Sequence, residues 1–294
     1  MTTLLVRRAG ELSEAESIAI SAAATALGSG EGRDVLSEQA RRALVPRSEA
    51  DHLIVVEDSR VVSYAQLRHG SYQLELEFLG DVVDEDLIDV ARGIALEGET
   101  RLVAWVHGRA ESSRPVLPGG VRVIREIRRL SRALPGPDLP APPASITLRS
   151  FVPSVDDSDW LALNARTFHE HPDQGRWEQS DLRARLVEPW FYASGFLIAQ
   201  EEATMVGWCW TKIHRDPWGQ TGEIYVIGVD PDHVGRGLGR FLVCAGMDSL
   251  WQRKQSSVML YVESTNEAAL ALYDSLDFSL EWCDVLIEIS TELG

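Results

Sequence analysis

A proline-rich stretch divides the sequence into two halves of similar length. Residues 134–143 contain five prolines among ten residues. Proline fixes φ and lacks a backbone N–H, so this density blocks helix and sheet pairing and favours an extended connector. A chain of 294 residues is long enough for two domains. We therefore expect domains at 1–134 and 145–294, joined by a linker at 135–144.

The two halves repeat the same order of elements with little identity. Apolar and β-branched runs predict a strand, a polar turn and a second strand in each half, and a further strand follows. Helical patterns precede each hairpin. Segment 53–64 of the first half is equivalent to 196–207 of the second, and 102–107 is equivalent to 259–264. The helical patterns are 12–28, 33–44, 156–170 and 178–187.

This repetition predicts an α+β fold of two tandem domains. Each domain is expected to have a mixed, mostly antiparallel sheet flanked by helices. The offset between equivalent strands grows from 143 to 157 positions, so the first half lacks about a dozen residues there. We expect the missing segment to comprise a loop and part of a helix, which makes the first domain a degenerate copy.

Composition excludes several classes of protein. The net charge of −17 opposes binding to nucleic acid. Excess acid suits a cationic substrate such as an amine, although it also simply keeps a protein soluble. No apolar run reaches the roughly 20 residues of a membrane span, and the N-terminus does not resemble a signal peptide. We expect a cytoplasmic monomer that acts on a small-molecule amine, without a membrane or nucleic-acid partner.

The cysteines give no sign of a metal site or a disulfide framework. The three of them, Cys209, Cys244 and Cys283, are scattered and form no CxxC pair or Cys/His cluster. We therefore expect no metal and a reduced, intracellular setting.

The segment that carries most chemical information is a glycine-rich turn in the second half. A β-rich run ends at Asp230-Pro231, and Gly235, Gly237 and Gly239 then open an apolar-periodic helix. Glycines let backbone N–H groups approach an anion, and a helix N-terminus adds unpaired donors. Gly-x-Gly also makes simple turns, and this one matches neither a P-loop nor the dinucleotide fingerprint. Its context nevertheless predicts a pyrophosphate cradle.

A second motif follows at residues 258–278. A strand leads to Asn266 near a helix start, and Tyr273 comes seven residues later, with Phe278 beyond it. Seven residues are close to two helical turns, so Asn266 and Tyr273 are expected on the same face.

Together these motifs resemble those of the GNAT acetyltransferases, and the resemblance covers residues 145–290. It implies acetyl-CoA as co-substrate. Val234 departs from the family pattern, which has Gln or Arg there, but backbone donors carry most of the cradle. Gly228 suits the bulge that opens the sheet for pantetheine. The cofactor contacts implied are Ile227, Gly228, Val229, Val234, Gly235, Arg236, Gly237, Leu238, Gly239, Arg240, Asn266, Glu267, Ala268, Ala269, Leu270 and Ala271.

Four strings resemble more narrowly the mycothiol synthases, a two-domain family within that superfamily: 171–175, 210–214, 222–231 and 260–264. This resemblance implies acetyl transfer from acetyl-CoA to the cysteine amine of a cysteinyl-glucosaminyl-inositol. Asp173 stands where the family has Glu, and the match around Glu38 is short. The substrate contacts implied are Glu38, Asp173, Lys212, Glu223 and Tyr261.

The implied catalytic residues are Glu223 and Tyr273. Glu223 would take a proton from the amine, directly or through water, and Tyr273 would protonate the departing thiolate. A backbone N–H near Val229 would stabilise the oxyanion.

Each candidate also has a purely structural interpretation. Glu223 is then a solvated strand residue, Tyr273 packs beside Phe278, and Lys212 and Asp173 are surface charges. His214 and His233 receive no role from the sequence.

The first half lacks an equivalent glycine loop. Residues 74–86 are rich in acid, which would repel a pyrophosphate. We expect this domain to be catalytically silent. Two other functions remain open at this stage: acetylation of a different amine (an aminoglycoside, a polyamine or a protein N-terminus), or acyl-CoA sensing without catalysis.

Overall fold

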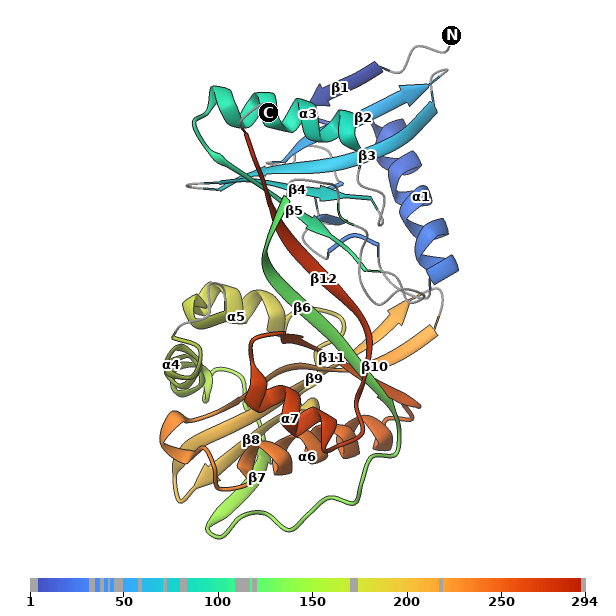
Figure 1. Ribbon diagram of the computed structural model, residues 1–294. Coiled ribbons are helices and arrows are strands. Elements are labelled where there is room, and N and C mark those ends of the chain that lie inside the picture. The colour runs from blue at the N-terminus through green and yellow to red at the C-terminus, as the bar shows by residue number, and fades with distance from the viewer. Residues whose placement is uncertain are drawn as a thin grey trace. The chain divides into compact units, whose positions relative to one another are not determined.

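The computed structural model describes most of the chain, and its contacts divide it into two compact units (Figure 1). The first unit comprises Met1–Arg129, Glu263–Thr265 and Leu280–Gly294, and the second comprises Leu130–Val262 and Asn266–Ser279. The described residues are 5–31, 35–37, 40–41, 43–44, 50–57, 60–70, 73–79, 84–108, 117, 121–169, 174–216 and 219–291.

This division differs from the boundaries expected at 134 and 145. The C-terminal strand pairs with β5 of the first half, from Val285 opposite Val106 to Ile289 opposite Leu102. Its apolar side chains complete the first unit's core, so contacts assign it there although it follows the second half in sequence. The stretch 135–143 contains no helix or strand, as its prolines predict.

The first unit has the strand order β1-β2-β3-β4-β5-β12-β6. Neighbours from β1 to β4 are antiparallel, β4 and β5 are parallel, and β5 and β12 are antiparallel. The elements are β1 Leu5–Ala9, α1 Glu14–Glu31, β2 Asp51–Glu57, β3 Arg60–His69, β4 Gln73–Phe78, α3 Glu85–Glu97, β5 Arg101–Val106, β6 Val121–Ala133 and β12 Ser279–Ile289. The unit boundary between Arg129 and Leu130 falls within β6, so this strand contributes to both units.

Helices cover both faces of this sheet (Figure 1). Leu87, Ala91 and Ala95 of α3 pack on one face, four positions apart as a helix requires. Ile20 of α1 packs on the other. Asp84 caps α3 by accepting a hydrogen bond from the backbone N–H of Asp86 (3.0 Å).

A buried charged cluster joins three strands of the first unit. Glu77 on β4 accepts hydrogen bonds from the backbone N–H and hydroxyl of Ser37 (2.6 and 2.9 Å). His107, just after β5, lies between Glu77 (3.6 Å) and Asp284 of β12 (3.3 Å). Burial lowers the pKa of His107, but the carboxylates of Asp284 and Glu77 outweigh it and raise that pKa to about 10. The cluster therefore holds a charged imidazolium.

The second unit has the strand order β6-β11-β10-β9-β8-β7. Strands β7 to β10 are antiparallel to their neighbours, whereas β10 and β11 are parallel. The elements are β7 Ile146–Ser150, α4 Asp157–Thr167, η1 Gln174–Arg176, α5 Gln179–Leu186, η2 Ala193–Gly195, β8 Phe196–Glu201, β9 Thr204–Asp216, β10 Gly219–Val229, η3 Pro231–His233, α6 Leu238–Gln252, β11 Ser257–Glu263 and α7 Glu267–Asp274.

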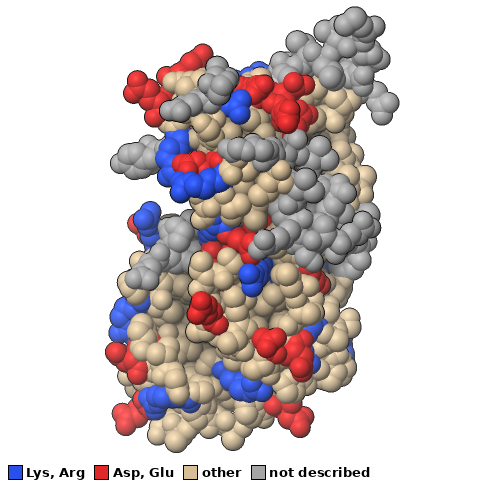
Figure 2. Space-filling model, in the orientation of Figure 1, with Lys and Arg blue, Asp and Glu red and all other residues tan. Residues whose placement is uncertain are grey.

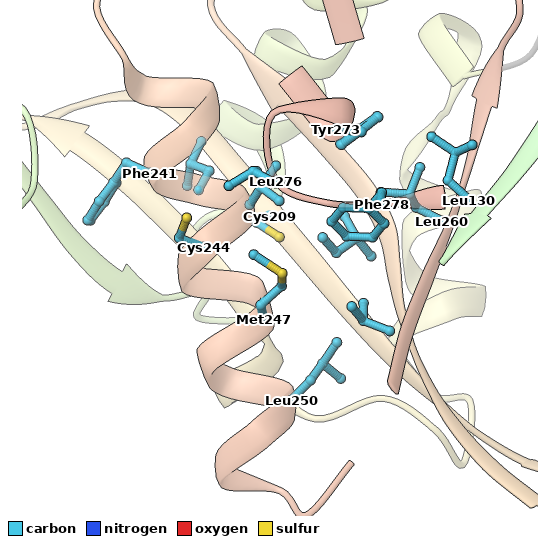
Figure 3. Close-up of a cluster of buried hydrophobic side chains, with 14 of the residues drawn as sticks. Leu130, Cys209, Phe241, Cys244, Met247, Leu250, Leu260, Tyr273, Leu276 and Phe278 are labelled. Atoms are coloured by element: carbon cyan, nitrogen blue, oxygen red, sulfur yellow. The ribbon is translucent and has the colours of Figure 1, made fainter. Parts of the chain in front are cut away.

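Two cores sandwich this sheet. On one face, α6 and α7 cover a cluster that includes Tyr273 and Phe278 (Figure 3). On the other, α4 and α5 cover an aromatic cluster in which Trp160, Trp208 and Trp210 are fully buried. The two indoles from β9 are thus core residues.

The helices lie close to the positions that periodicity predicts. The pattern at 12–28 corresponds to α1, that at 156–170 to α4 and that at 178–187 to α5. The pattern at 33–44 falls partly outside the described residues. The helix expected to be shortened in the first half is α3, with 13 residues against 15 in its counterpart α6.

Charged groups of both signs share the visible face, and the cysteines lie in the interior. On the face shown in Figure 2, Lys and Arg are scattered among Asp and Glu. The three cysteines are free and buried. Within the described ranges, no helix is long and apolar enough to cross a membrane, and no cluster of His, Cys, Asp and Glu is arranged to hold a metal.

Candidate active site

Two parallel strands of the second unit separate shortly after they meet. β10 pairs with β11 at only two positions, Gly222 opposite Val258 and Glu223 opposite Met259. On its other side β10 stays paired with β9 as far as Val229. The edge of β10 that faces β11 therefore presents backbone groups beyond Glu223, and a linear ligand can pair with them.

A β-bulge marks the point where the strands separate. The register of β10 against β9 shifts between Ile224 and Val226, so Tyr225 is the extra residue. The sequence placed this bulge at Gly228, which is three residues too late. Gly228 is needed for a different reason, because a Cβ there would lie 2.3 Å from Cη2 of Trp208.

The residues around the gap face opposite sides of the sheet. Ile224 packs into the core that contains Tyr273, as do Ile227 and Val229 after the bulge. Successive strand residues alternate, so Glu223 points to the other face. Tyr273 and Glu223 thus lie on opposite faces of the sheet.

The glycine loop follows β10 and ends at α6. Gly235 and Gly237 have φ values of +77° and +79°, in the left-handed region that favours glycine. A Cβ at either position would meet nothing within 4 Å, so the backbone conformation rather than crowding requires glycine there. Gly237 is the N-cap of α6 and offers no side-chain cap, which leaves the first-turn N–H groups available to an anion.

Neighbouring side chains fix the ends of this loop. Asp230 is buried and accepts a hydrogen bond from the N–H of Asp232 (3.0 Å). Glu201 at the end of β8 bonds Arg236 (2.6 Å) and His233 (3.1 Å). Those two partners hold the pKa of the Glu201 carboxyl below its usual range.

The second motif forms the start of α7. Asn266 caps the helix by accepting a hydrogen bond from the N–H of Ala269 (3.1 Å). Tyr273, near its end, is 5% exposed and packs against Phe278 (Figure 3). Burial raises the pKa of the Tyr273 hydroxyl well above its ordinary value, and the adjacent Cys209 thiol adds to the effect. The hydroxyl therefore keeps its proton at neutral pH.

Glu223 is buried beside two basic side chains. Lys212 stands directly opposite it on β9. The Nε2 atom of His214 lies 2.6 Å from Oε2 of Glu223. This carboxylate is therefore a partnered group in a partly enclosed site, and the interpretation of Glu223 as a solvated strand residue does not hold.

Aromatic rings line the same face. The Lys212 ammonium lies over the rings of Trp190 (5.0 Å) and Tyr225 (5.4 Å). The hydroxyl of Tyr225 accepts a hydrogen bond from Arg185 of α5 (3.1 Å). Met259 on β11 is opposite Glu223, and Tyr261, two residues further on, lies on the same face of the sheet. Tyr261 is 47% exposed.

The comparisons with known proteins agree with this geometry. The acetyltransferase (GNAT) family model matches residues 160–278. Mycothiol acetyltransferase of Streptomyces coelicolor is 36% identical over 293 residues, which cover 96% of this chain and 94% of that protein. Mycothiol acetyltransferase of Acidimicrobium ferrooxidans is 41% identical over 246 residues, 79% of each chain.

The chain belongs to the mycothiol acetyltransferase family.

Solved structures support the fold assigned to this family member. A GCN5-related N-acetyltransferase from Sphaerobacter thermophilus superposes with a TM-score of 0.71 at 21% identity, covering 99% of this chain and 96% of that one. A tandem GNAT protein from the clavulanic acid biosynthesis pathway gives 0.69 at 16% identity, covering 99% and 100%. The tandem GNAT fold, predicted from the sequence, is confirmed.

The structure gathers most of the residues that the mycothiol acetyltransferase resemblance singled out. Lys212, Glu223 and Tyr261 share one face beside the gap between the strands. The glycine loop and the open edge of β10 follow in sequence, and α7 begins after β11. Val234 in that loop is 63% exposed. Glu38 and Asp173 lie outside the described residues.

Sequence reasoning missed three residues of this site. His214 was assigned no role, although it is two residues from Lys212 and therefore on the same face of β9. Its place beside Glu223 follows from the register of β9 against β10. Trp190 and Tyr225 were also missed, because Trp190 precedes β8 in an irregular segment and the bulge determines where Tyr225 points.

Proposed function

We propose that this protein transfers the acetyl group of acetyl-CoA to the cysteine amine of a cysteinyl-glucosaminyl-inositol, the acetylation step of mycothiol biosynthesis. The observation that carries this proposal is the gap between β10 and β11, with Glu223 and Tyr273 on opposite faces of the sheet. A thioester held in such a gap can be attacked by an amine from one face while its thiolate leaves toward the other.

The chain's own groups fit acetyl-CoA in three places. First-turn N–H groups of α6 and the open loop over Gly235 and Gly237 suit the pyrophosphate. The unpaired edge of Ile227 to Val229 suits the amide groups of the pantetheine arm. An N–H near Val229 would also stabilise the oxyanion of the tetrahedral intermediate.

Proton bookkeeping gives each catalytic side chain a task. The acceptor enters as an ammonium and leaves as an amide, so its nitrogen gives up two protons. Glu223 takes the first and frees the electron pair that forms the new C–N bond. When the C–S bond breaks, Tyr273 donates a proton to the sulfur. The second proton lost by the amine nitrogen then reprotonates Tyr273 through solvent. One proton is released overall.

The acceptor pocket suits a cationic and hydroxylated molecule. Glu223 attracts an ammonium, while Lys212 and Tyr261 offer hydrogen-bond donors to the hydroxyl groups of a sugar or an inositol. Trp190 and Tyr225 lie beneath the Lys212 ammonium and form an aromatic wall beside it. Glu38 and Asp173 remain proposed contacts to the same molecule.

The first unit, by contrast, is proposed to be catalytically silent. Its equivalent parallel strands, β4 and β5, stay paired over five positions, from Gln73 opposite Arg101 to Glu77 opposite Trp105. This leaves no open edge comparable to that of β10 within the described strands.

The proposal is tested by following product formation with mass spectrometry. Wild-type protein is incubated with acetyl-CoA and the cysteinyl-glucosaminyl-inositol, alongside Glu223→Gln and Tyr273→Phe. Glu288→Gln, which alters a carboxylate on β12 of the first unit, is the matched control. We expect acetylated product from the wild type and the control, and a loss of about 100-fold or more in the two site variants.

Two other results would contradict the proposal. Acetylation of simple amines but not of this acceptor would retain the acetyltransferase and discard the proposed substrate. Binding of acetyl-CoA without transfer to any amine would indicate a sensor.

A further inference from the structure

His214 forms a direct hydrogen bond with the proposed general base. Its Nε2 atom lies 2.6 Å from Oε2 of Glu223, and the side chains are 18% and 8% exposed. An ionised carboxylate can only accept hydrogen bonds, so when Glu223 is ionised this contact assigns the shared proton to Nε2 of the imidazole. The bond is short, as expected when one partner is charged.

We propose that His214 is a positioning residue for Glu223, holding its carboxylate ionised and turned toward the acceptor amine. This inference rests on the proposed function, because it assigns a second residue to the same base. His214 acts through Glu223 and need not touch the substrate.

The sheet register explains why this histidine reaches the carboxylate. Thr221 is opposite His214 and Glu223 is opposite Lys212, so His214 is the diagonal neighbour of Glu223 on one face of the sheet. The β9–β10 ladder continues along the strands before and after this pair, and the backbone positions of the two residues are therefore fixed. A hydrogen bond between them needs little further ordering.

The bond has two consequences for an amine acylation. First, fixing Oε2 fixes the rotation of the carboxyl group, and with it the direction in which the carboxylate meets an incoming ammonium. Second, a hydrogen bond donated to the charged form favours ionisation, so Glu223 remains a base at lower pH than it would alone.

Other charged and titratable groups also face this carboxylate. Lys212 lies opposite it on β9, Tyr225 follows it on β10 and Tyr261 lies on β11. From α5, Arg185 reaches the hydroxyl of Tyr225. Lys212 adds positive charge, but its ammonium is also placed over two aromatic rings. The contact between His214 and Glu223 is directed, with Nε2 2.6 Å from Oε2.

Three substitutions separate the hydrogen bond from simple packing. His214→Gln retains an N–H donor close to the position of Nε2. In His214→Asn the side chain is too short for its N–H to reach Glu223, and His214→Phe keeps a ring without a donor. We expect Gln to stay within about threefold of the wild-type kcat, whereas Asn and Phe lose about 10- to 100-fold. The KM for acetyl-CoA should not change.

The pH profile distinguishes this role from a structural one. In His214→Phe and His214→Asn, the acid limb of the kcat/KM profile should move up by about one pH unit or more, and in His214→Gln it should stay in place. His69→Gln, which alters a 52% exposed histidine of the first unit, is the control and should match the wild type. Circular dichroism verifies that each variant is folded.

A wild-type rate and profile in His214→Phe would overturn the inference, as would a loss in His214→Gln equal to that in Phe. If the wild type acetylates a different amine, the proposed substrate fails, and the same comparison on that amine still tests His214. A readout independent of activity is the Nε2–H proton in the NMR spectrum of the wild type. Its absence at neutral pH, or its persistence unchanged in Glu223→Ala, would also contradict the proposal.

Discussion

Replacing Tyr273 with phenylalanine should abolish most activity while leaving the fold intact. The ring is 5% exposed and packs against Phe278, and phenylalanine preserves those contacts. Within the described part of the chain the hydroxyl has no hydrogen-bond partner, so its removal should change the free energy of unfolding by less than about 1 kcal/mol. The same hydroxyl is proposed to protonate the CoA thiolate, and losing a general acid should lower kcat by about 100- to 10,000-fold.

A second tyrosine of this unit provides the opposite case. The hydroxyl of Tyr192 donates a hydrogen bond to Oγ1 of Thr211 (2.7 Å), which in turn donates to the carbonyl of Gly195 (2.9 Å). Tyr192→Phe removes one partly buried hydrogen bond and should cost about 1 kcal/mol of stability. Because Tyr192 has no proposed part in catalysis, kcat should be unchanged.

The assay combines chemical denaturation with steady-state kinetics across pH. Tyr273→Phe should lose kcat but not stability, and Tyr192→Phe the reverse. Wild-type kcat in Tyr273→Phe would refute the assignment of the acid. A large loss of stability would instead show that the hydroxyl has a structural role.

Three further predictions concern backbone, packing and charge. Gly237→Ala, at a φ of +79°, should cost about 1 to 2 kcal/mol of stability and weaken acetyl-CoA binding measured by calorimetry; unchanged affinity would argue against the cradle. Gly228→Ala brings a Cβ to 2.3 Å from the buried ring of Trp208 and should cost about 1 to 3 kcal/mol in thermal unfolding, with no change expected only if the ring can move. The pKa of His107 is raised to about 10, so its contribution to stability is complete below its ordinary value of 6.5 and is lost as pH rises through 10. Denaturation between pH 6 and 10 should show the wild type losing stability relative to His107→Gln, and parallel curves would contradict the buried ion pair.

The fold was largely predictable because its determinants are local. The prolines at 135–143, the paired hairpins and the glycine turn are each read within a few residues. The pairing of the C-terminal strand β12 with β5 of the first unit was not predictable. Pairing β12 with β5 joins residues about 180 positions apart, and no local pattern encodes such a partner.

The candidate site was predictable where motif and chemistry coincide. Tyr273 and the glycine loop carry recognisable spacing, whereas Glu223 was implied by the family resemblance. His214 required the strand register, which runs unbroken from Gly219 opposite Asp216 to Ile224 opposite Thr211. A one-residue change in register reverses which side chains share a face, so a lone histidine cannot be assigned a partner from sequence alone. The bulge was expected at Gly228 because glycine suits such a position, but Tyr225 occupies it and Gly228 instead makes room for Trp208.

The contrast between the two units shows what a GNAT site requires beyond its glycine loop. Both units have a parallel strand pair, but β4 and β5 remain paired over five positions whereas β10 and β11 pair over two. Opening three further positions in the first unit would break several interstrand hydrogen bonds, at a net cost of about 1 kcal/mol each. A ligand would have to recover that free energy on binding. In the second unit β10 and β11 are already unpaired beyond Glu223, so a ligand bound there need not spend binding energy on opening the sheet. By this argument, the silence proposed for the first unit would follow from its continuous strand pairing as much as from the acidic residues near it.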